Sequence, residues 1–230
     1  MKTVAILQSN YIPWLGYFYI ISQADVFVLY DIVQYTKNDW RNRNRILSSS
    51  GPQWLTVPVA HSNLEQAIDS VTIAKPQWAK KHWRSIEQNY RKSPFFEQCH
   101  AGFKQIYNQH WEHLTELNQA LIREACDCLG ISTTIINARE LQPNGDRNEK
   151  LVDICIKLKA SNYLSGPAAK NYIEPQRFHE QQVQLDWVDY SPLAPLCPAN
   201  SENFSILHTI FNNLGQARQL LAEHSSQKMR

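Results

Sequence analysis

The 230-residue chain has no long hydrophobic run, because polar residues interrupt every apolar stretch. A membrane-spanning helix needs about 18 or more consecutive apolar residues, so we expect no membrane span. The first predicted strand begins at Thr3, so we expect no signal peptide before it. The formal net charge is only +2, so the overall charge gives little reason to expect a nucleic-acid partner. Internal repeats and low-complexity linkers are also absent, and we expect one domain over residues 1–230, with a frayed tail over 225–230.

Patterns typical of disulfides and metal sites are missing as well. The five cysteines are odd in number and have no regular spacing, which predicts reduced thiols and a cytoplasmic protein. Cys126 and Cys128 are two residues apart in a predicted helix and point to different sides. His110 and His113 belong to no His-Glu-x-x-His motif or other closed ligand set. We therefore expect no metal and no other cofactor.

The informative part of the chain is its amino-terminal segment, which reads as strand, helix and strand. Residues 3–7 form a short apolar run, and a helix is predicted from Pro13 to Ala24, because proline is tolerated in a first helical turn. Residues 26–30 contain no polar interruption, which is typical of a strand covered on both faces. The segment is thus a predicted βαβ unit with a right-handed connection.

The same alternation continues through the chain. Asp31 to Ser50 is interpreted as a long connection. Further strands are predicted over 53–59, 71–73, 133–136, 162–164 and 183–188, and helices over 77–92, 94–108, 112–129, 147–159 and 204–223. Gly130 is expected to cap one helix, and Gly215 to interrupt the last. This order predicts an α/β fold: a Rossmann-like, doubly wound, mostly parallel sheet with a helical segment inserted around residues 76–129.

Two loops rich in polar and aromatic residues should leave the same edge of this sheet. Gln8 and Asn10 follow the first strand, and Asp31 follows the second. Open parallel sheets bind ligands beyond the carboxyl ends of their strands, and the helix amino end near Trp14 would add free N–H groups. We therefore expect one crevice here, although ordinary loop residues are the alternative. Its other expected contacts are Tyr11, Gln34 and Tyr35.

A basic run rich in amides and arginines follows between residues 37 and 45. An arginine fork suits phosphate or carboxylate, and asparagine offers both a donor and an acceptor. The run predicts contact with a phosphorylated or nucleotide-bearing ligand, and a solvated basic loop is the alternative. Its expected binding residues are Lys37, Trp40, Asn42, Arg43 and Asn44.

Later segments add candidates of two kinds. His82 lies beside the apolar stripe of the helix predicted over 77–92, and Asn89 continues that polar side. Histidine exchanges a proton near neutral pH, although a structural histidine is the commoner case beside such a stripe. Ser165 and Gly166 precede a predicted helix start, where they predict an anion cradle or an ordinary glycine turn.

Several blocks of this sequence resemble the WbqC-like protein family. They are residues 8–18, 24–25, 31–37, 40–44, 54–59, 81–83, 89–90 and 163–166, and the Asn-Arg-Asn and Trp-Leu-Thr-Val-Pro sequences are the most specific of them. The resemblance covers about residues 3–215 and implies a role in bacterial surface polysaccharides or other secondary products. The chain also departs from the family pattern, because Leu7 stands where the family usually has histidine. If that histidine carries a proton in relatives, this chain uses another group or different chemistry.

Two main hypotheses follow. The first is a biosynthetic transferase that moves an acyl or aminoacyl group from a thioester or other activated donor onto an amino-sugar nucleotide or a carrier-bound precursor. Gln8, Asn10 and Tyr11 would position the acceptor, Lys37 and Arg43 would hold its phosphate, and His82 or Asp31 would move a proton, so that His82, Asp31 and Tyr11 form the expected catalytic group. A cysteine nucleophile is not expected, because no cysteine lies in the matched loops.

The second hypothesis is a non-catalytic protein that binds a nucleotide, a nucleotide sugar or a partner protein. It predicts affinity without turnover. In either case the expected ligand carries phosphate, with a carrier protein as the candidate macromolecular partner. A tRNA that donates an aminoacyl group is a further alternative, which the small net charge weakens without excluding it.

Overall fold

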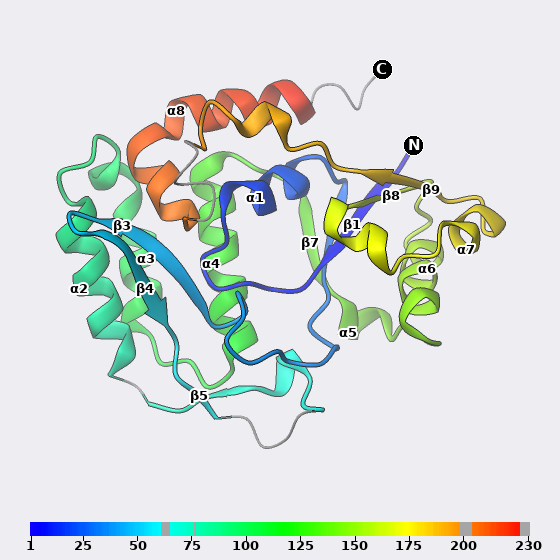
Figure 1. Ribbon diagram of the computed structural model, residues 1–230, viewed down its shortest axis with the longest axis horizontal. Coiled ribbons are helices and arrows are strands. Elements are labelled where there is room, and N and C mark those ends of the chain that lie inside the picture. Colours follow the sequence, from blue (N-terminus) through cyan, green and yellow to red (C-terminus); the bar gives the residue numbers. More distant parts are fainter. Residues whose placement is uncertain (61–64, 76, 198–203, 226–230) are drawn as a thin grey trace.

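A five-stranded parallel sheet lies at the centre of the protein, in the order β7–β2–β1–β8–β9 (Figure 1). It is seen in a computed structural model that describes residues 1–60, 65–75, 77–197 and 204–225. The strands are β1 (Thr3–Leu7), β2 (Val26–Leu29), β7 (Thr134–Asn137), β8 (Asn162–Ser165) and β9 (Gln184–Trp187). The predicted α/β, Rossmann-like fold is therefore confirmed.

The sheet is buried on both faces because successive side chains of its inner strands enter two different cores. In β2, Val26 and Val28 belong to one core, whereas Phe27 and Leu29 belong to the other. Successive side chains of a strand point to opposite faces, so a strand covered on both sides must be apolar at every position. This is why the uninterrupted apolar run of β2 identified a central strand.

Helices cover both faces of the sheet, as a doubly wound fold requires. The larger core is packed by α1 (Leu15–Ser22), α4 (Leu114–Leu129) and α8 (Ile206–Ser225). The smaller core is covered by α6 (Arg147–Lys157) and α7 (Pro175–Glu180), after the short α5 (Ala138–Leu141). No helix in the described ranges is both long and apolar enough to cross a membrane.

The connection between the neighbouring strands β2 and β7 is larger than the predicted helical insertion. It contains the antiparallel hairpin β3 (Arg43–Ser48) and β4 (Gly51–Thr56), the pair β5 (Val59–Ala60) and β6 (Thr72–Ile73), and the helices α2 (Trp78–Tyr90) and α3 (Phe96–Asn108). Helix α4 is the last helix of this connection, and its buried side chains belong to the larger core beside the sheet. Residue 76, where the insertion was predicted to begin, lies outside the described residues.

The prediction of a loop as far as Ser50 is wrong, because β3 begins at Arg43. In β3, Asn44 and Ile46 are buried, while Arg43 and Arg45 lie on the opposite face. The strand therefore alternates as a half-buried strand should. An asparagine at one of the two inward positions disguised that period.

Smaller differences concern the ends of the helices. The helix predicted from Pro13 begins at Leu15, and the one predicted at Pro167 is a short 3₁₀ turn over Pro167–Asn171. Gly130 caps α4 with a left-handed φ of 74°, as expected. The break expected near Gly215 falls at Asn213, whose φ is −133°. The predicted tail lies, from residue 226 onward, outside the described residues. Two further 3₁₀ turns cover Ile68–Ser70 and Ser191–Leu193.

Candidate functional site

The loop after β1 occupies the position where this fold usually binds ligands. From β1 the chain moves outward to β2 and β7, and it then returns to the other side of β1 for β8 and β9. Connections therefore leave β1 and β8 in opposite directions, which opens a crevice beyond their carboxyl ends. Residues 8–14 of the first loop border this crevice from one side, and Ser165 and Gly166 border it from the other.

Asp31 fastens this loop to the second strand and to α4. Its Oδ1 accepts a hydrogen bond of 2.7 Å from the backbone N–H of Ser9, and its Oδ2 accepts one of 2.5 Å from the Thr115 hydroxyl. The side chain is buried, and burial raises the pKa of its carboxyl, although the bonds from Thr115 and Ser9 act in the opposite direction. Asp31 is thus a buried carboxyl that is easier to protonate than an exposed one.

Arg41 is the cation that faces the loop after β1. Its Nη1 donates to Asn10 Oδ1 at 2.8 Å, its Nη2 donates to Gln8 Oε1, and Asp39 lies 3.6 Å from Nη2. Its Nε is buried and has no partner among the residues that the structure describes. Arg41 therefore gathers the first loop and the basic run around one guanidinium group.

The sequence predicted Lys37 and Arg43 as the phosphate-binding cations and passed over Arg41, although all three belong to the same run. It also missed Thr115 and Asn118 on α4. Asn118 donates to the carbonyl of Arg41 at 2.8 Å and thereby fixes the backbone at that residue. A signal for both α4 residues was present, because they interrupt the apolar face of an amphipathic helix at a spacing of three.

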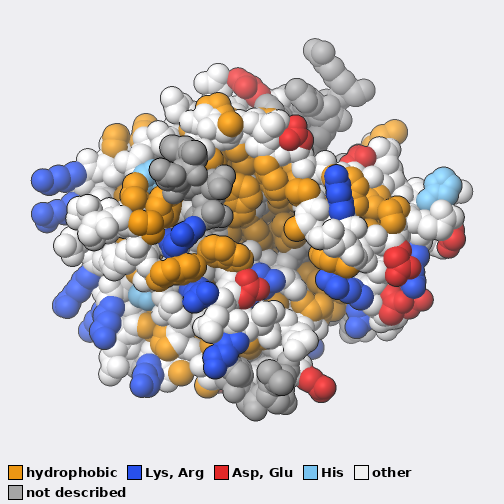
Figure 2. Space-filling model, viewed as in Figure 1, with side chains coloured by type: hydrophobic (Ala, Val, Ile, Leu, Met, Phe, Trp, Pro, Cys, Tyr) orange, Lys and Arg blue, Asp and Glu red, His pale blue; other side chains and the backbone are white. Residues whose placement is uncertain are grey.

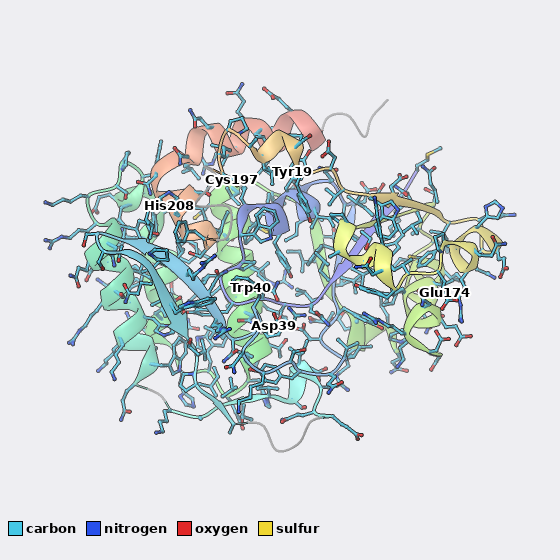
Figure 3. All side chains as sticks on the ribbon, viewed as in Figure 1. Tyr19, Asp39, Trp40, Glu174, Cys197 and His208 are labelled. Atoms are coloured by element: carbon cyan, nitrogen blue, oxygen red, sulfur yellow. The ribbon has the colours of Figure 1, made fainter. Side chains whose placement is uncertain are left out.

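A cavity of about 210 Å³ opens beside Asn10, to which Arg41 donates a hydrogen bond. It is lined by Asn10, Pro13, Trp14, Trp40 and Asn44, and we refer to it as the aromatic pocket. Figure 3 places Trp40 and Asp39 near the middle of the molecule, between the hairpin and the loop that leads to α1. In Figure 2 the same face is hollowed and carries hydrophobic side chains at its centre, with Lys and Arg side chains along the lower left border.

A second cavity, of about 390 Å³, lies beyond the carboxyl ends of β2 and β7, and we refer to it as the acidic pocket. Asp31 lines it together with Asp69, Thr115, Glu116, Gln119, Asn137, Arg139 and Glu140. Arg139 pairs with Asp69 at 2.6 Å. Four carboxyl groups against one guanidinium give this pocket a negative balance, in contrast to the surroundings of Arg41.

His82 and Tyr11 contact each other in the interior of the protein, and neither side chain lines the aromatic pocket or the acidic pocket. The Tyr11 hydroxyl lies 2.7 Å from His82 Nδ1 and 2.6 Å from the Tyr107 hydroxyl. Both predicted residues are buried, and burial lowers the pKa of His82 to about 4 despite a hydrogen bond to the backbone of Thr56. His82 is therefore a neutral, hydrogen-bonded histidine near pH 7.

The side chains of Asn42 and Asn44, which were predicted to bind a ligand, instead form hydrogen bonds with backbone groups of the protein. Asn44 donates to the carbonyls of Tyr11 and Ile12 at 3.3 and 2.8 Å, and its Oδ1 accepts from the N–H of Arg45. Ile12 has a φ of +38°, which a β-branched residue rarely adopts. Asn44 thus supports a strained turn at the site. Asn42 donates to the carbonyl of Val57 at 2.9 Å.

The other members of the predicted set are spread around the hairpin. The guanidinium of Arg43 lies 4.5 Å from the ring centre of Trp54, which in turn stacks on Trp40. Lys37 and Gln34 are exposed, and Tyr35 is buried. Asn89 donates to the carbonyl of Ser85 within its own helix at 2.7 Å.

On the far side of the crevice, Tyr190 joins the two loops. Its ring centre lies 5.1 Å from that of Trp14, and its hydroxyl would lie 3.6 Å from a Cβ at Gly166. Ser165 is buried at the end of β8. Only the 3₁₀ turn follows Gly166, so a helical anion cradle is not formed there. The nearby cation, Lys170, instead lies 5.6 Å from the ring centre of Trp187.

Gly16 holds Trp14 in place, and a substitution tests this. A Cβ at Gly16 would lie 2.2 Å from Cζ2 of the Trp14 indole, so the indole lies across the glycine. We expect Gly16→Ala to lower the free energy of unfolding by about 1–3 kcal/mol through overpacking, measured by urea titration. Gly215→Ala is the matched control, because among the described residues no atom beyond its chain neighbours and its own helix backbone lies within 4 Å of a Cβ there, and it should be neutral or slightly stabilising. Equal stability of Gly16→Ala and the parent protein would contradict this packing.

Comparison with known proteins agrees with the blocks recognised in the sequence. The model of the WbqC-like protein family matches residues 8–219. The uncharacterized protein Rv1507c of Mycobacterium tuberculosis (strain ATCC 25618 / H37Rv) is 43% identical over 193 residues, which are 83% of this chain and 83% of that protein. No solved structure matches the chain. The matched region includes both pockets and every predicted site residue, and on this basis the chain belongs to the WbqC-like protein family.

Proposed function

We propose that this protein is a biosynthetic transferase that acylates an amine on a phosphate-bearing acceptor. The donor is a thioester or another activated acyl or aminoacyl compound. The acceptor is an amino-sugar nucleotide or a carrier-bound precursor, in a surface polysaccharide or secondary metabolite pathway. One observation carries the proposal: the loop after β1 is bonded both to a cation and to the acidic pocket. Its Gln8 and Asn10 accept from Arg41, and its Ser9 N–H donates to Asp31, which lines the acidic pocket.

Arg41 is the proposed anchor for the phosphate of the acceptor. A guanidinium group presents a planar set of donors that matches phosphate oxygens. Gln8 and Asn10 already orient it, and its Nη groups reach the loop at the sheet edge. Preorganisation of this kind lowers the entropy lost when an anion binds.

Asp31 is the proposed proton acceptor for the amine. The acidic pocket favours an ammonium group, and the pKa of Asp31 is raised by burial, which makes its carboxylate a stronger base. The bound ammonium group first releases one proton to solvent. The neutral amine then attacks the thioester carbonyl carbon, the carbon–sulfur bond breaks, and the thiolate leaves. The amine proton passes to Asp31 and then to the departing thiolate, so that Asp31 is regenerated.

In this proposal Tyr11 and His82, the other two expected catalytic residues, have a structural role and do not contact the substrate. Tyr11 and His82 are bonded to each other inside the protein, and Tyr11 lies in the same loop as Gln8 and Asn10. No covalent enzyme intermediate is invoked. Four of the five cysteines are buried, and burial raises the pKa of each of these four thiols, which makes them poor nucleophiles. Reduced thiols also fit the proposed cytoplasmic location.

A thermal-shift screen with a turnover assay tests the proposal. The protein is heated with nucleotides, amino-sugar nucleotides, coenzyme A thioesters or phosphopantetheine mimics, because a ligand that binds the folded state raises the melting temperature. We expect a shift with amino-sugar nucleotides, and mass spectrometry should detect an acylated product once a suitable thioester is added. Arg41→Ala should weaken binding by about tenfold to a hundredfold, which is a loss of roughly 1.4–2.8 kcal/mol.

Further variants distinguish the phosphate-binding role of Arg41 from the proton-transfer role of Asp31. Arg43→Ala removes the same charge two positions away, where the guanidinium lies over Trp54, and we expect it to affect binding less. If Arg43→Ala abolishes binding and Arg41→Ala does not, the assignment of the anchor is wrong. Asp31→Asn should abolish product formation while the acceptor still binds. Binding without turnover under all donors would instead support the non-catalytic alternative.

A further inference from the structure

The aromatic pocket has the size of one ring system. Its volume of about 210 Å³ is smaller than the roughly 300–1,000 Å³ of pockets that enclose drug-sized ligands. Two of its five lining residues are tryptophans, which offer flat surfaces for stacking. The pocket therefore suits a planar group at one end of a longer ligand.

Trp40 provides a platform that is already part of a stack. It is 38% exposed, which is unusual for a large aromatic residue in this protein, and it stacks on Trp54 with ring centres 5.8 Å apart and an interplanar angle of 30°. The Arg43 guanidinium covers Trp54. Trp40 lines the pocket and Trp54 does not, so the pocket meets a surface of Trp40 that its neighbour leaves open.

The backbone of Trp40 and the indole of Trp14 are held by the surrounding structure before any ligand binds. The carbonyl of Trp40 accepts a hydrogen bond of 2.9 Å from the N–H of Tyr11. Trp14 lies across Gly16 and packs against Tyr190, with ring centres 5.1 Å apart. A rigid aromatic wall of this kind loses little conformational entropy on binding.

The two asparagines of the pocket differ in what they offer a ligand. Asn44 uses its amide N–H and its oxygen on backbone groups. Asn10 accepts from Arg41 through Oδ1 at 2.8 Å, which fixes the orientation of its amide group. Its Nδ2 donates to no residue in the described part of the chain. The pocket therefore presents an oriented donor to a ring that carries an acceptor, such as a carbonyl oxygen or a ring nitrogen.

We propose that the aromatic pocket binds the nucleobase of a nucleotide, stacked on Trp40 and hydrogen-bonded by Asn10 Nδ2. The inference rests on the proposed function for the phosphate, because Arg41 bonds Asn10 directly and thus places the anion site next to the ring site. It narrows the acceptor from a nucleotide or a carrier-bound precursor to a nucleotide. Tryptophan faces accept every base, so stacking supplies affinity, and the contact with Asn10 supplies the selection among bases.

Calorimetric titration with defined probes tests the ring site separately from the phosphate site. The probes are UMP, AMP, ribose 5-phosphate, and the nucleosides uridine and adenosine. We expect at least one nucleotide to bind about tenfold or more tightly than ribose 5-phosphate, in line with the usual contribution of base stacking. Trp40→Ala should remove this preference. Trp54→Ala is the matched control, because Trp54 is also exposed, at 46% against 38% for Trp40, and does not line the pocket; it should change affinity less than about threefold.

The outcomes separate the two proposals. If ribose 5-phosphate binds as tightly as both nucleotides, the nucleobase assignment is overturned and the phosphate anchor stands. If nucleosides bind in a Trp40-dependent way and Arg41→Ala has no effect on the nucleotides, the base pocket stands and the anchor fails. A base preference that survives in Trp40→Ala also overturns the inference, provided that circular dichroism confirms a folded variant.

Discussion

Acidification from pH 7 to pH 4 should lower the free energy of unfolding by about 3 kcal/mol through His82 alone. Burial lowers the pKa of this histidine from 6.5 to about 4 in the folded protein. The unfolded chain therefore binds the proton more readily, so the stabilisation is fully present above pH 6.5 and is lost as the pH falls toward 4. Each pKa unit corresponds to about 1.4 kcal/mol.

The hydrogen bonds around His82 explain why the folded protein favours the neutral imidazole over the imidazolium. Nδ1 is engaged by Tyr11, so the bond to the Thr56 backbone belongs to the other ring nitrogen. Tyr107 can then donate to Tyr11, Tyr11 to His82, and His82 to Thr56, and each polar hydrogen has an acceptor. The surrounding rings are Tyr11, Trp78 and Tyr107, and none of them supplies a negative charge for an imidazolium.

Denaturant titrations between pH 7.5 and 4 check this expectation. His82→Gln should flatten the pH dependence by about 3 kcal/mol, whereas His208→Gln, at another histidine whose pKa burial lowers, should flatten it less. Asp31 acts in the opposite direction, because its raised pKa favours folding as the pH falls toward 3.8. An unchanged slope in His82→Gln would refute the assignment. Should that variant fail to fold, NMR of the parent protein gives the same answer, since the His82 ring should not titrate above pH 5.

Tyr11→Phe should destabilise the protein by about 2–4 kcal/mol. The Tyr11 hydroxyl is the shared partner of His82 Nδ1 and of the Tyr107 hydroxyl, and it is completely buried. Its removal leaves both groups without that partner, and an unsatisfied buried polar group costs about 1–3 kcal/mol. Urea denaturation at pH 7.5, where His82 is neutral in both states, measures this cost without interference from titration.

Tyr107→Phe is the matched comparison because it lies at the end of the same chain of hydrogen bonds. Tyr11 keeps its bond to His82 in that variant, so a cost of only about 1 kcal/mol is expected. The double variant with both phenylalanines should be more stable than Tyr11→Phe alone, because it removes the orphaned Tyr107 hydroxyl. Simple additivity of the two single effects would show that the three side chains do not act as one network.

Local sequence was sufficient to locate most of the fold and the edge of the sheet at which the candidate site lies. The continuous apolar residues of β2 cannot form a stable surface element, so they must be a strand buried on both faces. Gln8 directly follows β1, and Asp31 follows β2 after one intervening residue, Tyr30. Parallel strands bring their carboxyl ends to one edge. These conclusions depend on periodicity and chain order, which neighbouring residues encode.

The tertiary structure decided which side chains meet at that edge. Tyr11 and His82 are 71 positions apart, and no local pattern reports that a histidine on α2 points at a tyrosine behind the first loop. Likewise, Arg41 and Arg43 are indistinguishable by composition. The pairing of β3 with β4 places Arg43 over Trp54, whereas Arg41, just before the strand, turns toward Gln8 and Asn10. The sequence by itself therefore determined the sheet and the position of the candidate site, while long-range packing and hydrogen bonding determined which side chains meet there.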